Sequence, residues 1–271
     1  MTNKENYALI TGGSSGLGKA FAEECARRGM NLILVALPDE NLIHTSQYIE
    51  KKYKVKVRSY GINLIEKGAP KKIFSFCEQN GLKVNMLINN AGITGCTEFE
   101  KSSLEYNELR IQLNIRSLVL LSRLFIPSMK KLTSAYILNV CSLAAFYAIP
   151  FKSVYSASKA FVLTFSKALR EELRDSSIKV SVLCPNGIRT NVLSNARINT
   201  HGARGRIFLV FPEKIAEIGI HKLLKGKKVI IPGTMNKLIL SLGKIIPENV
   251  KQKCLYHEFK KELEVCEEDT K

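Results

Sequence analysis

Short apolar runs alternate with amphipathic segments along most of this chain. The runs at 7–10 and 31–36 are almost entirely apolar, which is typical of strands buried on both faces of a sheet. Similar runs predict further strands at 55–60, 84–88, 135–140, 179–183 and 228–231. Between the runs, apolar residues recur every three or four positions, as they do on one face of a helix. The repeated strand–helix units predict an α/β fold: a single doubly wound parallel sheet of about seven strands with helices on both faces.

The first predicted strand stops at a glycine-rich turn, TGGSSGLG at 11–18, and a helical pattern begins within it. Glycines let backbone N–H groups approach a pyrophosphate closely, and the helix N-terminus adds the positive end of its dipole. Such a turn between a strand and a helix is typical of a nucleotide site. The residues we expect to bind the nucleotide here are Gly12, Ser14, Ser15, Gly16, Leu17 and Gly18.

Other small or polar residues follow the carboxyl ends of later strands, the edge of such a sheet where ligands bind. The fourth strand runs into NNAG at 89–92, and the fifth ends at Ser142. The sixth strand ends in CPNGIRT at 184–190. A single long helix predicted at 102–131 carries Asn114 near its middle. Small residues in these places permit a close approach of the backbone to a ligand.

Tyr155 and Lys159 are four residues apart in a predicted helix, so both side chains lie on one face. A protonated amine beside a phenol stabilises the phenolate. We therefore expect Lys159 to lower the pKa of Tyr155 from about 10 toward the working range. Tyr155 is a candidate proton donor or acceptor.

Taken together, these motifs resemble the short-chain dehydrogenase/reductase family over residues 5–232. The turn at 11–18 matches the family's TGxxxGxG pattern, and 89–92 matches its NNAG element. Pro185 and Thr190 keep the PGxxxT spacing, although Asn186 stands where glycine is usual. Four residues fall in the order and spacing of the family's catalytic tetrad: Asn114, Ser142, Tyr155 and Lys159.

The resemblance implies a role for each member of the tetrad. Tyr155 would donate a proton to a carbonyl oxygen during reduction and accept it during oxidation, while Ser142 hydrogen-bonds the same oxygen. Lys159 would keep the pKa of the tyrosine low and bind the ribose hydroxyls of the nicotinamide nucleotide. Asn114 would hold a water that links Lys159 to solvent. The cofactor supplies the hydride, and no metal is needed.

Cofactor preference in the family depends on the end of the second strand. Members that bind NAD usually carry an acidic residue there, and members that bind NADP carry arginine, which pairs with the 2′-phosphate. At the end of the second strand, Ala36 and Leu37 are neutral here, and so is Ser15 in the glycine turn. No acidic side chain therefore repels a 2′-phosphate at these positions. This favours NADP(H) over NAD(H). The resemblance assigns further cofactor contacts to Leu37, Asn63, Asn90, Ala91, Gly92, Tyr155, Lys159, Pro185, Gly187, Ile188 and Thr190.

The chain divides into a Rossmann-fold domain at 1–232, which includes a substrate loop at 186–211, and a basic amphipathic extension at 233–271. Arginines in the loop could meet an anionic head group or lie in solvent: Arg197, Arg204 and Arg206. In the extension, one predicted helical face carries Leu238, Leu242, Ile245 and Ile246, opposite Lys237, Lys244 and Lys251. A basic amphipathic helix can lie in a membrane interface, pack on its own domain or bind a second subunit.

The formal net charge of +17 suits an anionic cofactor, an acidic membrane surface or nucleic acid. No RNA-binding motif accompanies this charge, so nucleic acid is not expected as a partner. Seven scattered cysteines without a CxxC pair indicate reduced thiols in a cytosolic protein. With no signal peptide and no apolar stretch of spanning length, we expect a cytoplasmic location, with the extension as the candidate for membrane association.

These observations favour an NAD(P)H-dependent enzyme that reduces an apolar ketone. The basic tail resembles that of lipid-metabolising members such as 3-oxoacyl and 3-ketosphinganine reductases, so the small-molecule carbonyl substrate is expected to be lipid-like. One alternative is a hydroxysteroid or other secondary-alcohol dehydrogenase, and another is a non-catalytic protein that senses dinucleotides or binds nucleic acid. Family members commonly pair through the helices that hold Asn114 and Tyr155, which predicts a homodimer or homotetramer.

Overall fold

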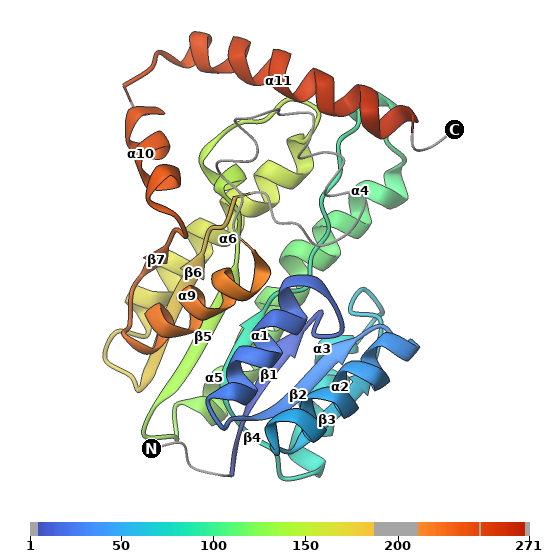
Figure 1. The fold of residues 1–271 in the computed structure, drawn as a ribbon, viewed down its shortest axis with the longest axis vertical. Helices are drawn as coiled ribbons and strands as arrows, with labels where there is room; N and C mark the ends of the chain where they lie inside the picture. Colours follow the sequence, from blue (N-terminus) through green and yellow to red (C-terminus); the bar gives the residue numbers. More distant parts are fainter. Residues whose placement is uncertain (1–4, 187–210, 244, 269–271) are drawn as a thin grey trace.

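A parallel sheet of seven strands runs through the computed structural model, which describes residues 5–186, 211–243 and 245–268 (Figure 1). The strand order is β3-β2-β1-β4-β5-β6-β7, so the chain reverses its direction of travel across the sheet between β1 and β4. The strands are β1 (Asn6–Thr11), β2 (Asn31–Ala36), β3 (Val57–Gly61), β4 (Lys83–Asn89), β5 (Ala135–Val140), β6 (Ile178–Leu183) and β7 (Val229–Ile230). The predicted α/β class and the number of strands are confirmed.

Helices cover both faces of the sheet. On one face, the core joins the strands to Phe21 of α1, Ile49 of α2 and Ile220 of α9. On the other face, it joins them to Ile73 of α3 and Phe125 of α5. The helices that surround the sheet are α1 (Gly16–Arg27), α2 (Glu40–Tyr53), α3 (Ala69–Gln79), α5 (Ser117–Met129), α6 (Ser153–Glu172) and α9 (Pro212–Leu224). Because both faces are covered, all six residues of β2 are buried, which explains its unbroken apolar pattern.

The segment predicted as one long helix is interrupted. Helix α4 covers Leu104–Ile111, a π-helical turn covers Gln112–Arg116, and α5 follows directly. Asn114 lies in this π turn, and turns of this kind occur frequently at functional sites. A wide turn is invisible to a search for apolar positions every three or four residues, because it shifts the spacing by only one residue.

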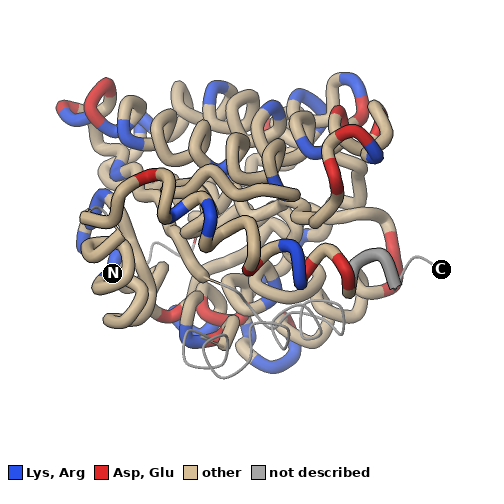
Figure 2. The backbone as a smooth tube through the Cα atoms, turned by 90° about the horizontal axis from the view of Figure 1, so that it is seen from above, with Lys and Arg blue, Asp and Glu red and all other residues tan. Residues whose placement is uncertain are grey.

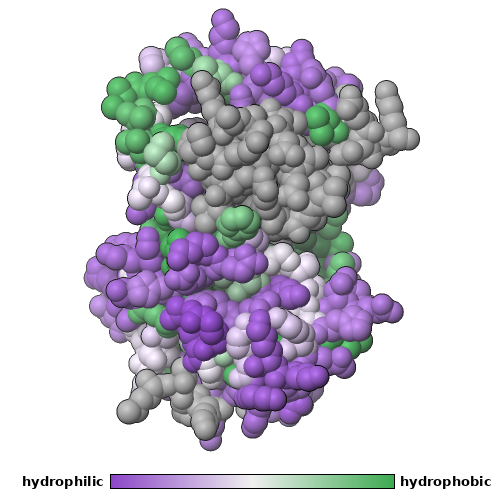
Figure 3. All heavy atoms as spheres, viewed as in Figure 1, coloured by the Kyte–Doolittle hydropathy of each residue, from purple (hydrophilic) through white to green (hydrophobic). Residues whose placement is uncertain are grey.

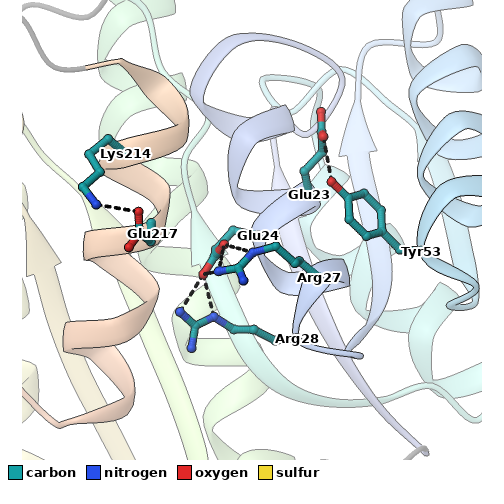
Figure 4. Close-up of polar contacts among 7 residues, drawn as sticks. All are labelled: Glu23, Glu24, Arg27, Arg28, Tyr53, Lys214 and Glu217. Atoms are coloured by element: carbon teal, nitrogen blue, oxygen red, sulfur yellow. Dashed lines mark hydrogen bonds and ion pairs between the residues drawn. The ribbon is translucent and has the colours of Figure 1, made fainter.

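Polar contacts tie α1 to itself and to α2 (Figure 4). The Glu24 side chain is only 7% exposed, and its carboxylate accepts hydrogen bonds from Arg27 (Nε–Oε2, 3.0 Å) and Arg28 (Nε–Oε1, 2.6 Å). The Tyr53 hydroxyl donates to Glu23 Oε2 at 3.0 Å, which joins α2 to α1. Burying a carboxylate is costly unless its oxygens are paired, and the two arginines supply that pairing.

Two helices follow the sheet, α10 (Thr234–Gly243) and α11 (Glu248–Glu268). The prediction of one helical face through Ile245 and Ile246 is wrong, because α10 ends at Gly243 and both residues lie in the connection to α11. Pro247 immediately precedes α11, where its missing N–H costs no helical hydrogen bond. From α10, α11 runs back across one end of the molecule (Figure 1). Within the described residues, no helix has the length and apolarity needed to cross a bilayer.

Replacing Phe125 by alanine tests the packing of the core between the sheet and helices α3 and α5. Its side chain is 1% exposed and meets Phe74 edge-on, with the ring centroids 5.2 Å apart. Phe125→Ala should lower the free energy of unfolding by about 3–5 kcal/mol, because a buried cavity replaces the ring. Phe99, which is 67% exposed, is the matched control. Phe99→Ala should change the free energy of unfolding, measured by urea titration, by less than about 0.5 kcal/mol. Equal losses in the two variants would contradict the assignment of this core.

Candidate active site

The glycine turn between β1 and α1 leaves no room for a side chain at Gly18. A Cβ atom on Gly18 would lie 1.8 Å from the carbonyl oxygen of Gly12, so only glycine fits there. Gly12 and Gly16 have φ angles of +65° and +51°, in the left-handed region that favours glycine. No side chain caps the start of α1 at Ser15, so its first backbone N–H groups remain available to an anion. The turn fits the pyrophosphate of a dinucleotide.

The Thr11 hydroxyl joins the ends of β1 and β4. Thr11 Oγ1 accepts hydrogen bonds from the backbone N–H groups of Asn90 and Ala91, both at 3.0 Å. A second bond joins the same segments, because Nδ2 of the Asn90 side chain donates to the Thr11 carbonyl oxygen at 2.9 Å. These bonds span the point where the strand order reverses, which is where doubly wound sheets bind their ligands. Asn90 and Ala91 thus lie beside the glycine turn, as predicted.

The end of β2 agrees with the predicted lack of an acidic group for the ribose. Leu37 follows Ala36 and is 55% exposed. The first acidic residue after the strand, Asp39, is engaged elsewhere: its Oδ1 accepts from the N–H of Leu42 at 3.0 Å and caps α2. Asn63 lies two residues beyond β3, and its Oδ1 accepts from Ile65 N at 3.3 Å. Its predicted contact with adenine stays a prediction.

Tyr155 and Ser142 meet at the carboxyl end of β5. Ser142 follows the strand, and its hydroxyl accepts from the N–H of Ala144 at 3.1 Å. Tyr155 lies in the first turn of α6, and the side chains of Ser142 and Thr94 lie close enough to its hydroxyl to lower its pKa. Sequence reasoning missed Thr94, since nothing in its spacing marks it. A carbonyl oxygen placed at the Tyr155 hydroxyl would also be within reach of Ser142.

Lys159 and Asn114 gather around Gly92. A Cβ atom on Gly92 would lie 2.9 Å from Asn114 Oδ1 and 3.4 Å from Lys159 Nζ, so the small residue at this position allows both polar groups to approach the backbone. Asn114 Oδ1 also accepts from the N–H of Ile93 at 2.9 Å. Its Nδ2 donates to the hydroxyl of Ser158, one residue before Lys159, at 3.1 Å. The structure therefore brings the whole predicted tetrad together, whereas the water assigned to Asn114 stays a prediction.

The expected effect of Lys159 on Tyr155 is wrong for the protein alone. Burial raises the pKa of Tyr155 to about 12, and the negative charges of Cys141 and Glu262 add to this, while hydrogen bonds from Ser142 and Thr94 oppose it. Lys159 Nζ lies 5.8 Å from the centre of the tyrosine ring and donates to the Val140 carbonyl at 3.2 Å. Burial in turn lowers the pKa of Lys159. Desolvation is the largest cause of both shifts, and it disfavours the charged form of each group.

The loop after β6 is described only at its start. Pro185 is buried, and its carbonyl accepts from the N–H of Leu143 at 2.9 Å, which holds the ends of β5 and β6 together. Asn186, which replaces the family's usual glycine, donates to Asn236 Oδ1 of α10 at 3.1 Å. Gly187, Ile188 and Thr190 lie outside the described residues, as do the loop arginines Arg197, Arg204 and Arg206.

A model of the short chain dehydrogenase family matches residues 6–200, which include the turn, the NNAG element and the tetrad. The chain belongs to this family.

Two curated members of the family show how similar its relatives are. Very-long-chain 3-oxoacyl-CoA reductase of Bos taurus is 31% identical over 192 residues, which is 69% of this chain and 60% of that protein. The 17-beta-hydroxysteroid dehydrogenase type 3 of Mus musculus is 37% identical over 187 residues, which is 68% of this chain and 60% of that protein. The chain thus spans 60% of the length of these relatives.

A family member of known structure extends the similarity to the fold. The short-chain dehydrogenase from Sphingobium yanoikuyae, solved in complex with NADPH, is 26% identical and superimposes with a TM-score of 0.77. The match covers 90% of this chain and 97% of that chain. It therefore includes most of the sheet and of the helices that position the tetrad.

A methyl group at Gly18 should destroy the nucleotide site. Gly18→Ala forces the turn away from the Gly12 carbonyl, so the affinity for NADPH should fall at least about 100-fold, or about 2.7 kcal/mol, in a fluorescence titration. Gly81 is the control, because its φ is +62° and no atom lies within 4 Å of an added Cβ. Gly81→Ala should cost about 1 kcal/mol of stability and leave NADPH affinity unchanged. If Gly18→Ala binds NADPH normally, the turn is not the site.

Proposed function

We propose that this chain is an NAD(P)H-dependent oxidoreductase that reduces a ketone to a secondary alcohol. The observation that carries the proposal is the convergence of Tyr155, Ser142, Lys159 and Asn114 at the edge of the sheet where the glycine turn lies. The glycines leave a cradle that fits a dinucleotide. Such a cofactor, when bound, supplies the hydride.

The mechanism assigns each proton and hydrogen bond to a residue of the chain. Ser142 hydrogen-bonds the carbonyl oxygen of the ketone and orients it toward the Tyr155 hydroxyl. Tyr155 gives its proton to that oxygen, and the high pKa of the buried tyrosine keeps it in the protonated form that reduction requires. Lys159 would hold the ribose hydroxyls of the nicotinamide nucleotide, and Asn114 would hold a water through which the replacement proton could reach Tyr155.

For the substrate, we propose an apolar, lipid-like ketone of the 3-oxoacyl or ketosphingoid type. The names of the curated reductases support this class, because they specify very long acyl chains. A hydroxysteroid, oxidised at a secondary alcohol, is the second candidate, and the murine relative supports it. A non-catalytic or nucleic-acid-binding role is not favoured, since the family match includes the complete tetrad. Screening 3-oxoacyl thioesters, ketosphingoid bases and 17-ketosteroids separates the two candidates.

We propose NADP(H) rather than NAD(H) as the cofactor. The neutral positions Ala36 and Leu37 support this choice, as does the engagement of Asp39 in capping α2. The related structure from Sphingobium yanoikuyae contains NADPH. Separate titrations with NADPH and NADH test the preference, and tighter binding of NADH would overturn it.

The proposed assembly is a homodimer or homotetramer in the cytoplasm, formed through the helices that carry Asn114 and Tyr155. The outer face of α6 supports such pairing, since Phe161 is 41% exposed and stacks on Phe165 with centroids 5.9 Å apart. An apolar surface of this kind is typical of an interface between subunits. Sedimentation of the purified chain measures the number of subunits.

We further propose that α10 touches an anionic lipid surface. Met235, Leu238, Ile239 and Leu242 recur at helical spacing, yet they are 36–51% exposed, and Ile245 beyond the helix is 80% exposed. A green patch covers this part of the molecule in Figure 3. A helix normally turns its apolar stripe toward the core. The exposed apolar stripe of α10 is therefore typical of a surface that binds a partner.

Charge supports a lipid partner over a second copy of the chain. Burial lowers the pKa of Lys222, and the nearby charges of Lys237 and Lys227 lower it further, so three lysines repel one another beside α10. Anionic head groups would relieve this repulsion, while a second copy would bring more positive charge. Along α11, in contrast, acidic residues are interspersed with the lysines (Figure 2).

Replacing Tyr155 by phenylalanine tests the mechanism. Tyr155→Phe removes the proton donor and should lower kcat at least about 100-fold, while the affinity for NADPH changes little. Tyr136→Phe, on β5, is the control and should retain full turnover, since Tyr136 has no part in the site. Consumption of NADPH is followed by absorbance with the best ketone of the screen. Normal turnover by Tyr155→Phe would exclude the assigned mechanism.

A charge on α10 tests the membrane contact. Leu242→Glu should abolish flotation with phosphatidylcholine vesicles that contain phosphatidylserine, because it places a carboxylate in the apolar stripe. Ile43→Glu, at a residue of α2 that is 54% exposed, should float like the wild type. Wild-type protein that stays at the bottom of the gradient, or that binds neutral vesicles equally well, contradicts the proposal. A loss of self-association in Leu242→Glu instead would identify a second copy of the chain as the partner.

A further inference from the structure

Helix α11 packs against two segments that build the candidate site. The first is the loop after β4, where Cys96 Sγ lies 3.8 Å from the carbonyl oxygen of Phe259. The second is the approach to α6, where the ring of Phe151 lies 5.3 Å from that of Tyr256. Leu263 of α11 is buried, with 5% of its surface exposed. Helix α11 is therefore attached to the domain at the edge where Thr94 and Tyr155 meet.

A buried ion pair makes the central contact of this attachment. Lys152 Nζ lies 2.6 Å from Glu262 Oε1, and the two side chains are only 12% and 3% exposed. The ammonium group also lies 4.8 Å from the centre of the Phe259 ring, at a distance typical of a cation–π contact. Buried ion pairs offset a large desolvation cost, so they contribute less to stability than to holding one particular geometry.

Lys152 is placed to transmit this geometry to the catalytic tyrosine. It is the residue that precedes α6, three positions before Tyr155. The preceding residue, Phe151, has a φ of +62°, which is strained for a bulky side chain and persists only where its surroundings fix it. Its carbonyl accepts from the N–H of Thr97 at 2.9 Å, and its ring meets α11. The first turn of α6 is thus held between the β4 loop and α11.

We propose that Lys152 and Glu262 are positioning residues, which latch α11 over the candidate site and set both the place and the electrostatic surroundings of the Tyr155 hydroxyl. The effect on Tyr155 rests on the proposed function. The attachment of α11 through the Lys152–Glu262 ion pair, which we call the latch, is a property of the fold. Both helix α11 and Glu262 lie beyond residue 200, where the match to the family model ends.

The electrostatic part follows from the groups that face the Tyr155 hydroxyl. Cys141 and Ser142 approach it from β5, Thr94 from the β4 loop, Lys159 from α6 itself and Glu262 from α11. The carboxylate of Glu262 raises the pKa of Tyr155, and Lys152 offsets that charge. Loss of Lys152 would leave this carboxylate without its partner, so we expect changes at the two residues to act on the tyrosine with opposite signs.

Two single variants separate a latch from an electrostatic role. Glu262→Gln and Lys152→Met break the same ion pair, so any loosening of α11 affects both alike. In alcohol oxidation Tyr155 must accept a proton, and below its pKa the rate follows the fraction of phenolate. Removing Glu262 increases that fraction, while removing Lys152 leaves the carboxylate uncompensated and decreases it. With NADP⁺ and 3-hydroxypalmitoyl-CoA at about pH 9, kcat/KM of Glu262→Gln should exceed that of Lys152→Met about tenfold.

Hydrogen–deuterium exchange tests the latch without turnover. Amides of 248–268 should exchange faster in both single variants than in the wild type, and the double variant Lys152→Glu with Glu262→Lys should restore protection. Glu171→Gln is the control, because it removes an exposed α6 carboxylate that pairs with Lys228 and should change neither exchange nor rate. Unchanged exchange in both single variants would overturn the latch.

The oxidation rates and the amide exchange test separate parts of the proposal, so either can contradict its part alone. If both single variants slow oxidation by the same factor, the electrostatic role is wrong. If the wild type oxidises and reduces no substrate while the exchange pattern appears as expected, the proposed function fails and the latch stands.

Discussion

The fold depends on how the chain is joined where the sheet reverses its strand order. Thr11 Oγ1 accepts from two consecutive backbone N–H groups that follow β4, and the Asn90 side chain returns a bond to the Thr11 carbonyl. These bonds, made by the side chains of Thr11 and Asn90, fix the glycine turn relative to the NNAG segment. The turn is packed so closely that a Cβ atom is excluded at Gly18 by the Gly12 carbonyl and crowded at Gly12 by the Asn90 side chain.

A second, fully buried set of hydrogen bonds places α6, the helix that carries Tyr155 and Lys159, on the sheet. Asn89 of β4 donates to Asn139 of β5 at 2.8 Å, and Asn139 donates to Ser166 of α6 at 2.9 Å. Such a chain of polar contacts in the core strongly favours one alignment of its members, since any slip leaves amides without partners. The alignment carries Tyr155, on the same helix, to the end of β5 where Ser142 stands.

Much of this arrangement was predictable because it is local or periodic. Apolar runs predicted the strands, and the motifs around Tyr155 predicted the tetrad that the structure brings together. The π turn at Asn114 and the outward apolar face of α10 were not predictable, since spacing shows a helix but not which side meets the core. Glu262 lies 107 positions after Tyr155, so only the fold reveals their proximity. The pKa of Tyr155 depends on burial, which no pattern measures.

The position of α11 has a consequence for how this chain can diverge. The residues of the tetrad lie inside the matched family segment, whereas the helix attached over them comes from the C-terminal segment outside it. Mutations in that helix can accumulate without disturbing the sheet or the glycine turn, whereas a change at Glu262 would reach Tyr155 through the ion pair with Lys152. Compounds aimed at the junction of α11 with α6 would contact a helix outside the matched family segment, so they need not bind every member that shares the tetrad.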